Sequence, residues 1–292
     1  MTSDLKSFDP SRTWEKGWYE VNSKKFFLKI FAAVCIFGLM ACAHSDITPA
    51  GEETREVPAA GGIQFDYADS ASLLVISPVE KEVLTLKNFQ VGTGRNRMLI
   101  VGVQAEEGGK ENIDDMVISS ITCGGRALAL IPGSEVQLSS MWRGKEYFLK
   151  VSLYYLINPP SGKHDITVTF AGPVTSANVG AISLFNTAQA APGNLVTGKQ
   201  DNQKKISTRI TTINDGAWVV DIVGGGHKSK LSPRSKGHVQ RFNSQESSGG
   251  KSSLVGGTLP VLSAGEVTLR WAQSRRLINR LAHVAVEIAP HK

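Results

Sequence analysis

The sequence predicts an all-β protein built as an antiparallel β-sandwich. Beyond about residue 62, apolar side chains alternate with polar ones, as in residues 63–67, or form short continuous runs, as in residues 98–103. Alternation with a period of two is typical of a strand with one buried face, and a short apolar run suits a central strand. The pair Gly124-Gly125 separates two such runs and predicts a hairpin, because a type I′ turn needs positive φ at both central positions.

Strand-like runs continue to the C-terminus, separated by turn residues such as Pro159-Pro160-Ser161-Gly162 and Asn214-Asp215-Gly216. The stretch 277–287 has a composition that also suits a helix. We expect a strand there, because its counterpart in the first half of the domain is a predicted strand. The further strands that we expect are 117–123, 126–131, 148–157, 165–170, 179–185, 206–213, 217–223, 266–271 and 282–288.

The two halves of the domain resemble each other. Residues 96–103 (NRMLIVGV) are similar to residues 215–222 (DGAWVVDI), and residues 161–185 are similar to residues 263–288. A sandwich of two sheets built from two related halves would give this pattern. The alternative is a chance likeness, since many β segments share such alternation.

Over about residues 95–290, the segments NRMLIVGVQ, ISSITCGG, VSLYYLINPPSGKHDITVTF and AHVAVEIAP together resemble a jelly-roll-type domain of bacterial secreted and surface proteins. This resemblance implies a jelly-roll-like extracellular sandwich over residues 63–292. It rests on strand cores and turns, and it carries no catalytic residues over to this chain.

The N-terminal region has the pattern of a signal peptide. Lysines precede residues 30–41, a stretch of about 12 residues without charge. That length suits the apolar region of a signal helix and is too short to span a bilayer. The end of this stretch and the residue after it, Leu39-Met40-Ala41-Cys42, resemble the lipobox of bacterial lipoproteins. The resemblance implies that residues 1–41 are removed and that Cys42 carries a diacylglycerol anchor. The alternatives are an ordinary secretory signal and a buried core helix.

Residues 1–25 are long and mixed in charge for a signal peptide, and translation from Val21 would give a compact basic start. Residues 42–62 are rich in Ala, Pro, Gly and acids, which predicts a flexible linker after the lipidated N-terminus. Ala43, rather than Asp, follows Cys42. We therefore expect the protein in the cell envelope. In a Gram-negative cell, the lipoprotein sorting pattern would imply the outer membrane.

Charge and cysteine content narrow the class of protein. The formal net charge is +6, of which residues 1–41 carry two, so the predicted mature chain carries about +4. This mild excess, together with export, argues against nucleic acid as a partner. After loss of Cys35 and lipidation of Cys42, Cys123 is the one cysteine left, so an intramolecular disulfide is excluded. We expect Cys123 to be a small buried apolar residue.

Three segments are candidate sites. The first is the acidic stretch 106–115, which we expect to be a loop between strands. Its carboxylates suit Ca²⁺, which binds six to eight oxygens, although the spacing is not that of an EF-hand. Calcium is the one cofactor that the sequence suggests, and the alternative is a solvated loop. The candidate ligands are Glu106, Glu107, Glu111, Asp114 and Asp115.

The second segment, residues 139–147, places Trp142, Arg143 and Tyr147 in a polar loop. Exposed aromatic rings stack on sugars while neighbouring charged groups bind hydroxyls, so these residues suit carbohydrate. The alternative is that Trp142 folds back to cap the sandwich.

The third segment, residues 227–238, contains four cations and no acid: Lys228, Lys230, Arg234 and Lys236. Such a segment suits the phosphates of lipopolysaccharide or another acidic polymer. The spacing is not that of a phosphate-binding P-loop. The alternative is a solvated loop without a ligand.

The sequence contains no G-x-S-x-G, no H-E-x-x-H and no His/Cys cluster with metal-ligand spacing. We therefore expect a non-catalytic, membrane-anchored binding domain at the cell surface, with carbohydrate as the first ligand class. The alternative is a structural or assembly lipoprotein that binds another envelope protein. A glycan-active enzyme is the third hypothesis.

Overall fold

The computed structural model describes residues 61–74, 81–109, 113–142, 144–226, 230–245, 252–273 and 279–292. The chain divides into two compact units, Met1–Thr54 and Arg55–Lys292, and the description below concerns the second. The predicted signal peptide, the lipidation site Cys42 and nearly all of the predicted linker lie outside the described residues. Within those residues, no helix has the length and apolar character needed to cross a membrane.

The first half of the domain forms two antiparallel sheets. The larger has the order β1-β10-β3-β8-β6, with β7 also paired to β8, and the smaller has the order β2-β9-β4-β5. Their bounds are β1 Gln64–Leu74, β2 Lys81–Val91, β3 Met98–Gly109, β4 Ile118–Cys123, β5 Arg126–Ala127, β6 Ala129–Leu130, β7 Val136–Trp142, β8 Lys145–Ile157, β9 Gly162–Val174 and β10 Ser176–Phe185, with a short 3-10 helix at Ile113–Met116.

The second half repeats this arrangement. Its larger sheet has the order β11-β18-β13-β16-β15, and its smaller sheet has the order β12-β17-β14. The bounds are β11 Gly193–Gln203, β12 Lys205–Thr212, β13 Trp218–Gly225, β14 Leu231–Pro233, β15 Val239–Gln245, β16 Ser253–Pro260, β17 Gly265–Gln273 and β18 Asn279–Ile288.

Strand order shows that the two halves share one topology. In each half the first strand pairs with the last, the last with the third, and the second with the penultimate, which is the interleaved order of a jelly roll. The similar sequence segments coincide with β3 and β13, and with β9–β10 and β17–β18. The all-β prediction is confirmed. The two-sheet sandwich that we expected is doubled, because each half forms its own pair of sheets.

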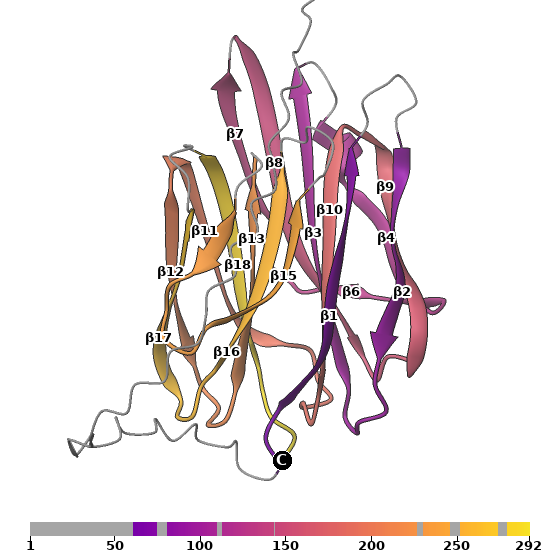
Figure 1. Ribbon diagram of the computed structural model, residues 1–292, viewed down its shortest axis with the longest axis vertical. Helices are drawn as coiled ribbons and strands as arrows, with labels where there is room; N and C mark the ends of the chain where they lie inside the picture. The colour runs from indigo at the N-terminus through magenta and orange to yellow at the C-terminus, as the bar shows by residue number, and fades with distance from the viewer. Residues whose placement is uncertain are drawn as a thin grey trace, which may run out of the picture. The chain divides into compact units, whose positions relative to one another are not determined.

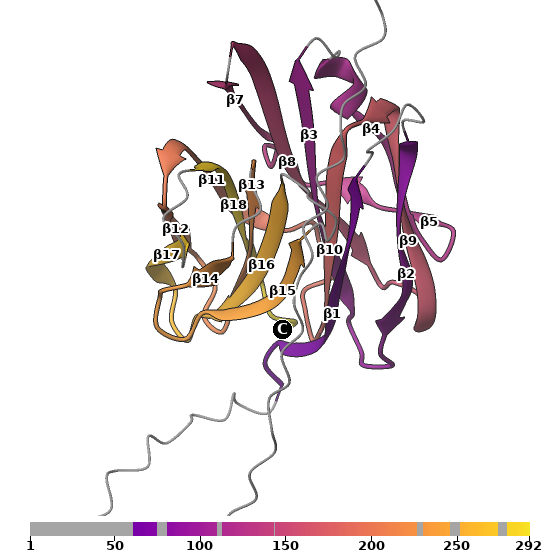
Figure 2. The same ribbon diagram turned by 45° about the horizontal axis from the view of Figure 1, so that its top comes forward.

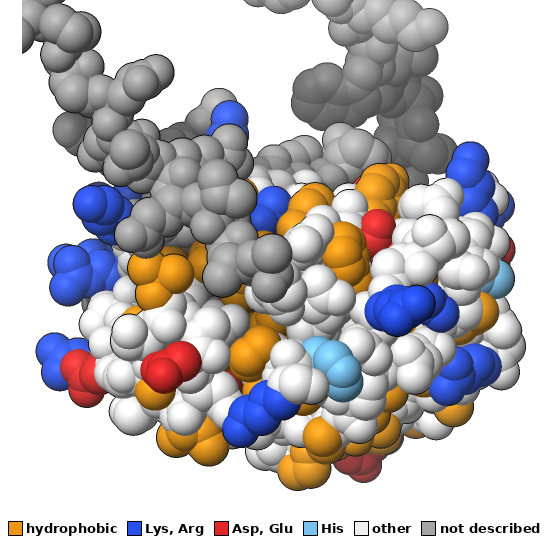
Figure 3. All heavy atoms as spheres, turned by 90° about the horizontal axis from the view of Figure 1, so that it is seen from below, with side chains coloured by type: hydrophobic (Ala, Val, Ile, Leu, Met, Phe, Trp, Pro, Cys, Tyr) orange, Lys and Arg blue, Asp and Glu red, His pale blue; other side chains and the backbone are white. Residues whose placement is uncertain are grey.

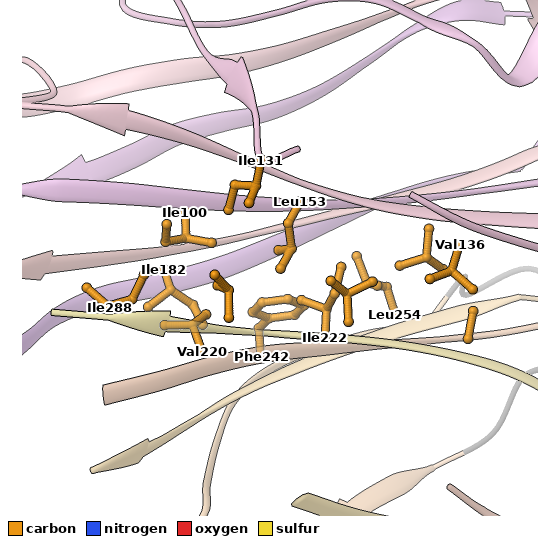
Figure 4. Packing of buried hydrophobic residues seen from close by; sticks show 14 of the residues in the cluster. Ile100, Ile131, Val136, Leu153, Ile182, Val220, Ile222, Phe242, Leu254 and Ile288 are labelled. Atoms are coloured by element: carbon orange, nitrogen blue, oxygen red, sulfur yellow. The ribbon is translucent and has the colours of Figure 1, made fainter. Parts of the chain in front are cut away.

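The four sheets stack in layers, and the larger sheets of the two halves face each other in the middle (Figures 1 and 2). Ile100 and Ile182 of the first half belong to one buried cluster with Val220 and Ile222 of the second (Figure 4). Leu99, on the opposite face of β3, belongs to the separate core of the first sandwich. Both faces of the larger sheets are therefore buried, which explains the continuous apolar runs of β3 and β13.

The contact between the larger sheets depends on a glycine opposite an aromatic ring. Phe242 of β15 is 6% exposed and belongs to the central cluster (Figure 4). A Cβ atom added at Gly180 of β10 or at Gly256 of β16 would overlap its ring. Gly180 lets the backbone of the facing sheet approach the ring closely, and Gly256, the cross-strand neighbour of Phe242, makes room for the ring within its own sheet.

Local predictions for particular segments are also confirmed. Gly124 and Gly125 have φ of +55° and +77° and join β4 to β5. The ambiguous stretch 277–287 forms the strand β18 where it is described. Cys123 is 0% exposed, and burial raises the pKa of its thiol to about 11 against the opposing charge of Arg126.

Candidate functional site

The outer face of the β12-β17-β14 sheet is the candidate site. Along β12, buried and exposed residues alternate without a break. Ile206 and Ile210 point into the sandwich core, so Lys205 and Arg209 point outward. Alternate residues of a strand occupy opposite faces, which places both cations on the solvent side of the sheet.

The neighbouring strands add arginines to the same face. Arg270 of β17 lies opposite Ser207, and Arg209 lies opposite Thr268, so the two arginines are diagonal neighbours. Arg234 directly follows β14, and its backbone N–H donates to the carbonyl of Arg270 at 2.8 Å. Together with Lys205 and Lys236, these three arginines form what we call the basic face.

The basic face has little compensating negative charge. Arg209 lies 3.7 Å from Glu266, and both side chains are more than half exposed, so this ion pair is weak. Among the residues that the structure describes, no other ion pair involves the five cations. Unbalanced positive charge on a rigid surface attracts anions.

A surface pocket of about 420 Å³ opens at the edge of the basic face. Lys236, Ser235 and Thr268 supply its polar lining, and the apolar lining comes from Leu259, Pro260, Val261, Leu262 and Val267. The pocket thus combines a cation and hydroxyl groups with an apolar wall.

The segment that carries Arg234 and Lys236 is held against β17. The hydroxyl of Ser235 donates to the carbonyl of Thr268 at 2.7 Å and accepts from the N–H of Arg270 at 3.0 Å. These bonds fix the backbone between the two cations, so this part of the predicted basic loop is a defined surface.

His238 anchors the end of the same segment in a buried polar network centred on Asp221. The ring Nε2 of His238 lies 2.9 Å from Asp221 Oδ1, and Nε2 of His283 lies 2.9 Å from Oδ2. Trp271 Nε1 donates to Oδ2 at 2.6 Å. On its other side, His283 Nδ1 lies 2.8 Å from the hydroxyl of Thr208.

The network lies in the middle of the second sandwich. Residues two positions before and after Asp221, His283 and Thr208 belong to two different apolar clusters. One cluster contains Ile206, Val223, Leu231, Val255, Trp271 and Leu281; the other contains Ile210, Val219, Leu259, Val261, Leu269 and Ala285. The core of the first sandwich is one apolar cluster, so this polar layer distinguishes the two halves.

Electrostatics keeps Asp221 ionised despite its complete burial. Burial alone would raise the pKa of its carboxyl. Attraction to His238 and hydrogen bonds from His238 and His283 outweigh this effect and hold the pKa well below its usual range. A buried charge of this kind persists when it is paired and fully hydrogen-bonded.

The order hydroxyl, imidazole, carboxylate in Thr208, His283 and Asp221 is that of a nucleophilic triad. Thr208 is 8% exposed, and the other two residues are 0% exposed. A hydroxyl inside the sandwich does not meet a substrate from solution. The arrangement instead ties β12, β13, β17 and β18 to the segment before β15.

The predicted basic segment contributes two of its four cations to the basic face, Arg234 and Lys236. Lys230 is exposed just before β14, and Lys228 lies outside the described residues. Lys205, Arg209 and Arg270 were missed by the sequence analysis, which considered only clusters along the chain. The alternation of KISTRITT at 205–212 was a signal that could have placed two of them on an outer face.

The prediction that residues 139–147 form a polar loop is wrong, because nearly all of them belong to the paired ends of β7 and β8. Tyr147 lies in β8 and is half-buried, and the guanidinium carbon of Arg280 lies 5.6 Å from its ring centre. The side chain of Trp142 and the whole of Arg143 lie outside the description. The carbohydrate-stacking role of these residues stays a prediction.

The acidic stretch differs from the loop that we expected, because β3 continues to Gly109 and contains Glu106 and Glu107. Both side chains are buried and, as strand neighbours, point to opposite faces. Glu106 pairs with Arg280 at 2.6 Å, whereas Glu107 accepts hydrogen bonds from the N–H and hydroxyl of Thr175. Sheet pairing thus extends into this stretch, where both buried carboxylates have hydrogen-bond donors.

The remaining acidic candidates lie elsewhere. Asp114 and Asp115 belong to the 3-10 helix Ile113–Met116, and Glu111 lies outside the described part of the chain. Among the described residues, no group of three or more His, Cys, Asp or Glu side chains is placed to hold a metal ion. The calcium hypothesis stays a prediction.

Comparison with known proteins gives no match: no protein-family model, no curated protein and no solved structure is similar to this chain. The functional argument therefore rests on the fold and on the geometry of the basic face.

Proposed function

We propose that this protein is a non-catalytic, lipid-anchored protein of the bacterial cell envelope that binds an acidic glycan through the basic face. The observation that carries the proposal is the set of five cations on one outer sheet face, with one weakly held acid among them. The predicted lipobox at Cys42 supports the anchor.

The chemistry of the face suits a polymer with repeated negative charges. Adjacent strands lie about 4.8 Å apart, and alternate residues of one strand lie about 6.7 Å apart, so the cations form an extended array. Hydroxyl groups lie between them: Ser207 and Thr211 on β12, and Thr268 on β17. Carboxylate or phosphate groups would pair with the cations while sugar hydroxyls bond to these side chains.

Titration calorimetry with a polyuronate such as alginate tests the proposal. The double variant Arg209→Glu/Arg270→Glu should lose affinity by at least tenfold, because each reversal replaces attraction by repulsion at the centre of the face. The matched control is Lys87→Glu/Lys163→Glu, which makes the same charge change at exposed positions of the outer sheet in the first half. Equal losses in the two double variants would refute the assignment to the basic face.

Salt dependence separates this mode of binding from recognition of neutral sugars. Raising the ionic strength from about 0.1 M to 1 M shortens the Debye length from about 10 Å to 3 Å, so affinity for the polyuronate should fall steeply. Affinity that is independent of salt, or equal affinity for a neutral glucan, would contradict the proposal.

The anchor is tested separately. Cells that express the full chain should incorporate labelled fatty acid into the protein, and Cys42→Ser should abolish the label. Label that persists in Cys42→Ser would show that Cys42 is not the acylated residue.

A further inference from the structure

One end of the domain gathers the point where the chain enters β1 and the C-terminus. The side chain of Asn186 donates to the carbonyl of Gly62 at 3.2 Å, and its backbone carbonyl accepts from the N–H of His291 at 2.8 Å. The N–H of Asn186 donates to the carbonyl of Arg95 at 2.9 Å. We call this the lower end, and it lies at the bottom of Figure 1.

Two large aliphatic side chains project into solvent at the lower end. Ile213, which follows β12, is 70% exposed, and Leu262, which follows β16, is 68% exposed. Their loops are neighbours, because the N–H of Gly216 donates to the carbonyl of Leu262 at 3.0 Å. Exposed aliphatic side chains on neighbouring loops are suited to contact with an apolar phase or a partner.

Hydrogen bonds hold both loops in place. The backbone N–H of Ile213 donates to both carboxylate oxygens of Glu287 at 3.1 Å. Asp215 accepts from the N–H of Ala264 at 2.7 Å, which links the two loops. Both aliphatic side chains are thus presented from fixed backbone positions.

Cations lie at the lower end, together with the exposed Asp215 in the loop of Ile213. Arg95 and Lys292 are exposed at the lower end, and Lys236 of the basic face lies in the pocket lining beside Leu262. Figure 3 views this end directly and shows hydrophobic side chains among Lys and Arg, with Asp and Glu side chains also present. In an interfacial contact with anionic lipid, apolar side chains insert into the bilayer while cations bind the lipid phosphates.

The covalent path from the predicted anchor ends at the same place. Residues 43–60 separate Cys42 from Gly61. This stretch spans at most about 65 Å when fully extended. A lipid on Cys42 would therefore attach the domain to the bilayer through its lower end.

We infer that the lower end docks on the membrane that carries the anchor, with Ile213 and Leu262 inserted between anionic phospholipid headgroups. This inference rests on the lipid anchor of the proposed function. Docking of the lower end leaves the part of the basic face on β12 and β17, Lys205, Arg209 and Arg270, open to a polymer.

The test uses the lipidated full chain in vesicles of phosphatidylcholine and phosphatidylglycerol. An environment-sensitive fluorophore is attached at Leu262→Cys or, as the matched control, at Met141→Cys. Met141 is 67% exposed on β7, whose pairing with the start of β8 places it at the opposite end. The native Cys123 is 0% exposed and does not compete for the label. Quenchers are carried on the lipid chains.

We expect quenching at position 262 and none at 141. Equal quenching at both positions, or none at 262 in protein shown by mass to be acylated, would overturn the inference while leaving the anchor intact. Absence of acyl mass on Cys42 would instead count against the proposed function.

A second measurement uses Cys42→Ser protein, which has no lipid, in vesicle sedimentation. The added pair Ile213→Ser/Leu262→Ser should lower vesicle affinity at least tenfold, because burial of the two aliphatic side chains is lost. Met141→Ser should leave the affinity unchanged. An equal effect of the two changes would also overturn the inference.

Discussion

The buried Asp221 network offers the sharpest test of the structure. We consider Asp221→Ala, which removes a fully buried carboxylate that accepts hydrogen bonds from His238, His283 and Trp271 at 2.6–2.9 Å. The substitution leaves three donors inside the sandwich without their acceptor. Each residue comes from a different strand or loop, so no small shift of one side chain restores the bonds.

The expected loss follows from the cost of unsatisfied buried groups. One such donor costs about 1–3 kcal/mol, and breaking a buried charge pair by removing one partner costs about 3–5 kcal/mol. We expect the free energy of unfolding to fall by about 3–5 kcal/mol. For a domain of this size the melting temperature should fall by about 6–20 °C.

Urea unfolding followed by tryptophan fluorescence measures this change, with Glu82→Ala as the control at an exposed acid. Asp221→Asn keeps the shape of the side chain and separates the effect of charge from that of volume. A loss below about 1 kcal/mol for Asp221→Ala, equal to that of the control, would show that the network contributes little and would refute the argument.

Three further predictions concern stability. The native state holds the pKa of Asp221 below its value of about 3.9 in the unfolded chain. In acid, the Asp221 carboxyl therefore takes up a proton when the protein unfolds. The contribution of Asp221 to the free energy of unfolding should be complete above about pH 5 and should be lost as the pH falls. In Asp221→Asn, the free energy of unfolding should therefore decrease less steeply on the acid side. Gly180→Ala should cost about 1–3 kcal/mol in urea unfolding because its Cβ overlaps the Phe242 ring, and Phe242→Leu should recover part of that loss in the double variant. Arg280→Met should lower the free energy of unfolding, measured by calorimetry, by about 3–5 kcal/mol, because it removes the guanidinium that pairs with the buried Glu106 carboxylate. A change near zero would contradict the importance of that pair.

Periodicity in the sequence was enough to predict the fold class. The stretch 63–67, which alternates with a period of two, lies in a strand from Gln64 onward, and the apolar run 98–103 lies in another. The similar segments 161–185 and 263–288 occupy equivalent places in a shared topology. The stacking of the two sandwiches was not predictable in the same way. It depends on which face of β3 meets β13, and an apolar run gives no information on which neighbour covers which face.

The candidate site was only partly predictable because it is assembled across strands. Arg234 and Lys236 were found as a cluster along the chain, whereas Arg270 joins them through the register of β14 and β17. The Asp221 network is assembled over longer separations still, since His283 follows 62 residues later. A lone Asp in the apolar run WVVDIVGG was the available signal, and its partners could not be named without the fold.

The central contact between the larger sheets gives the chain the architecture of a fused dimer. A single jelly roll would expose Ile100, Leu153 and Ile182 to water, so one half expressed alone should associate with a second copy or aggregate. The short connection between β10 and β11 replaces that bimolecular step with a high effective concentration.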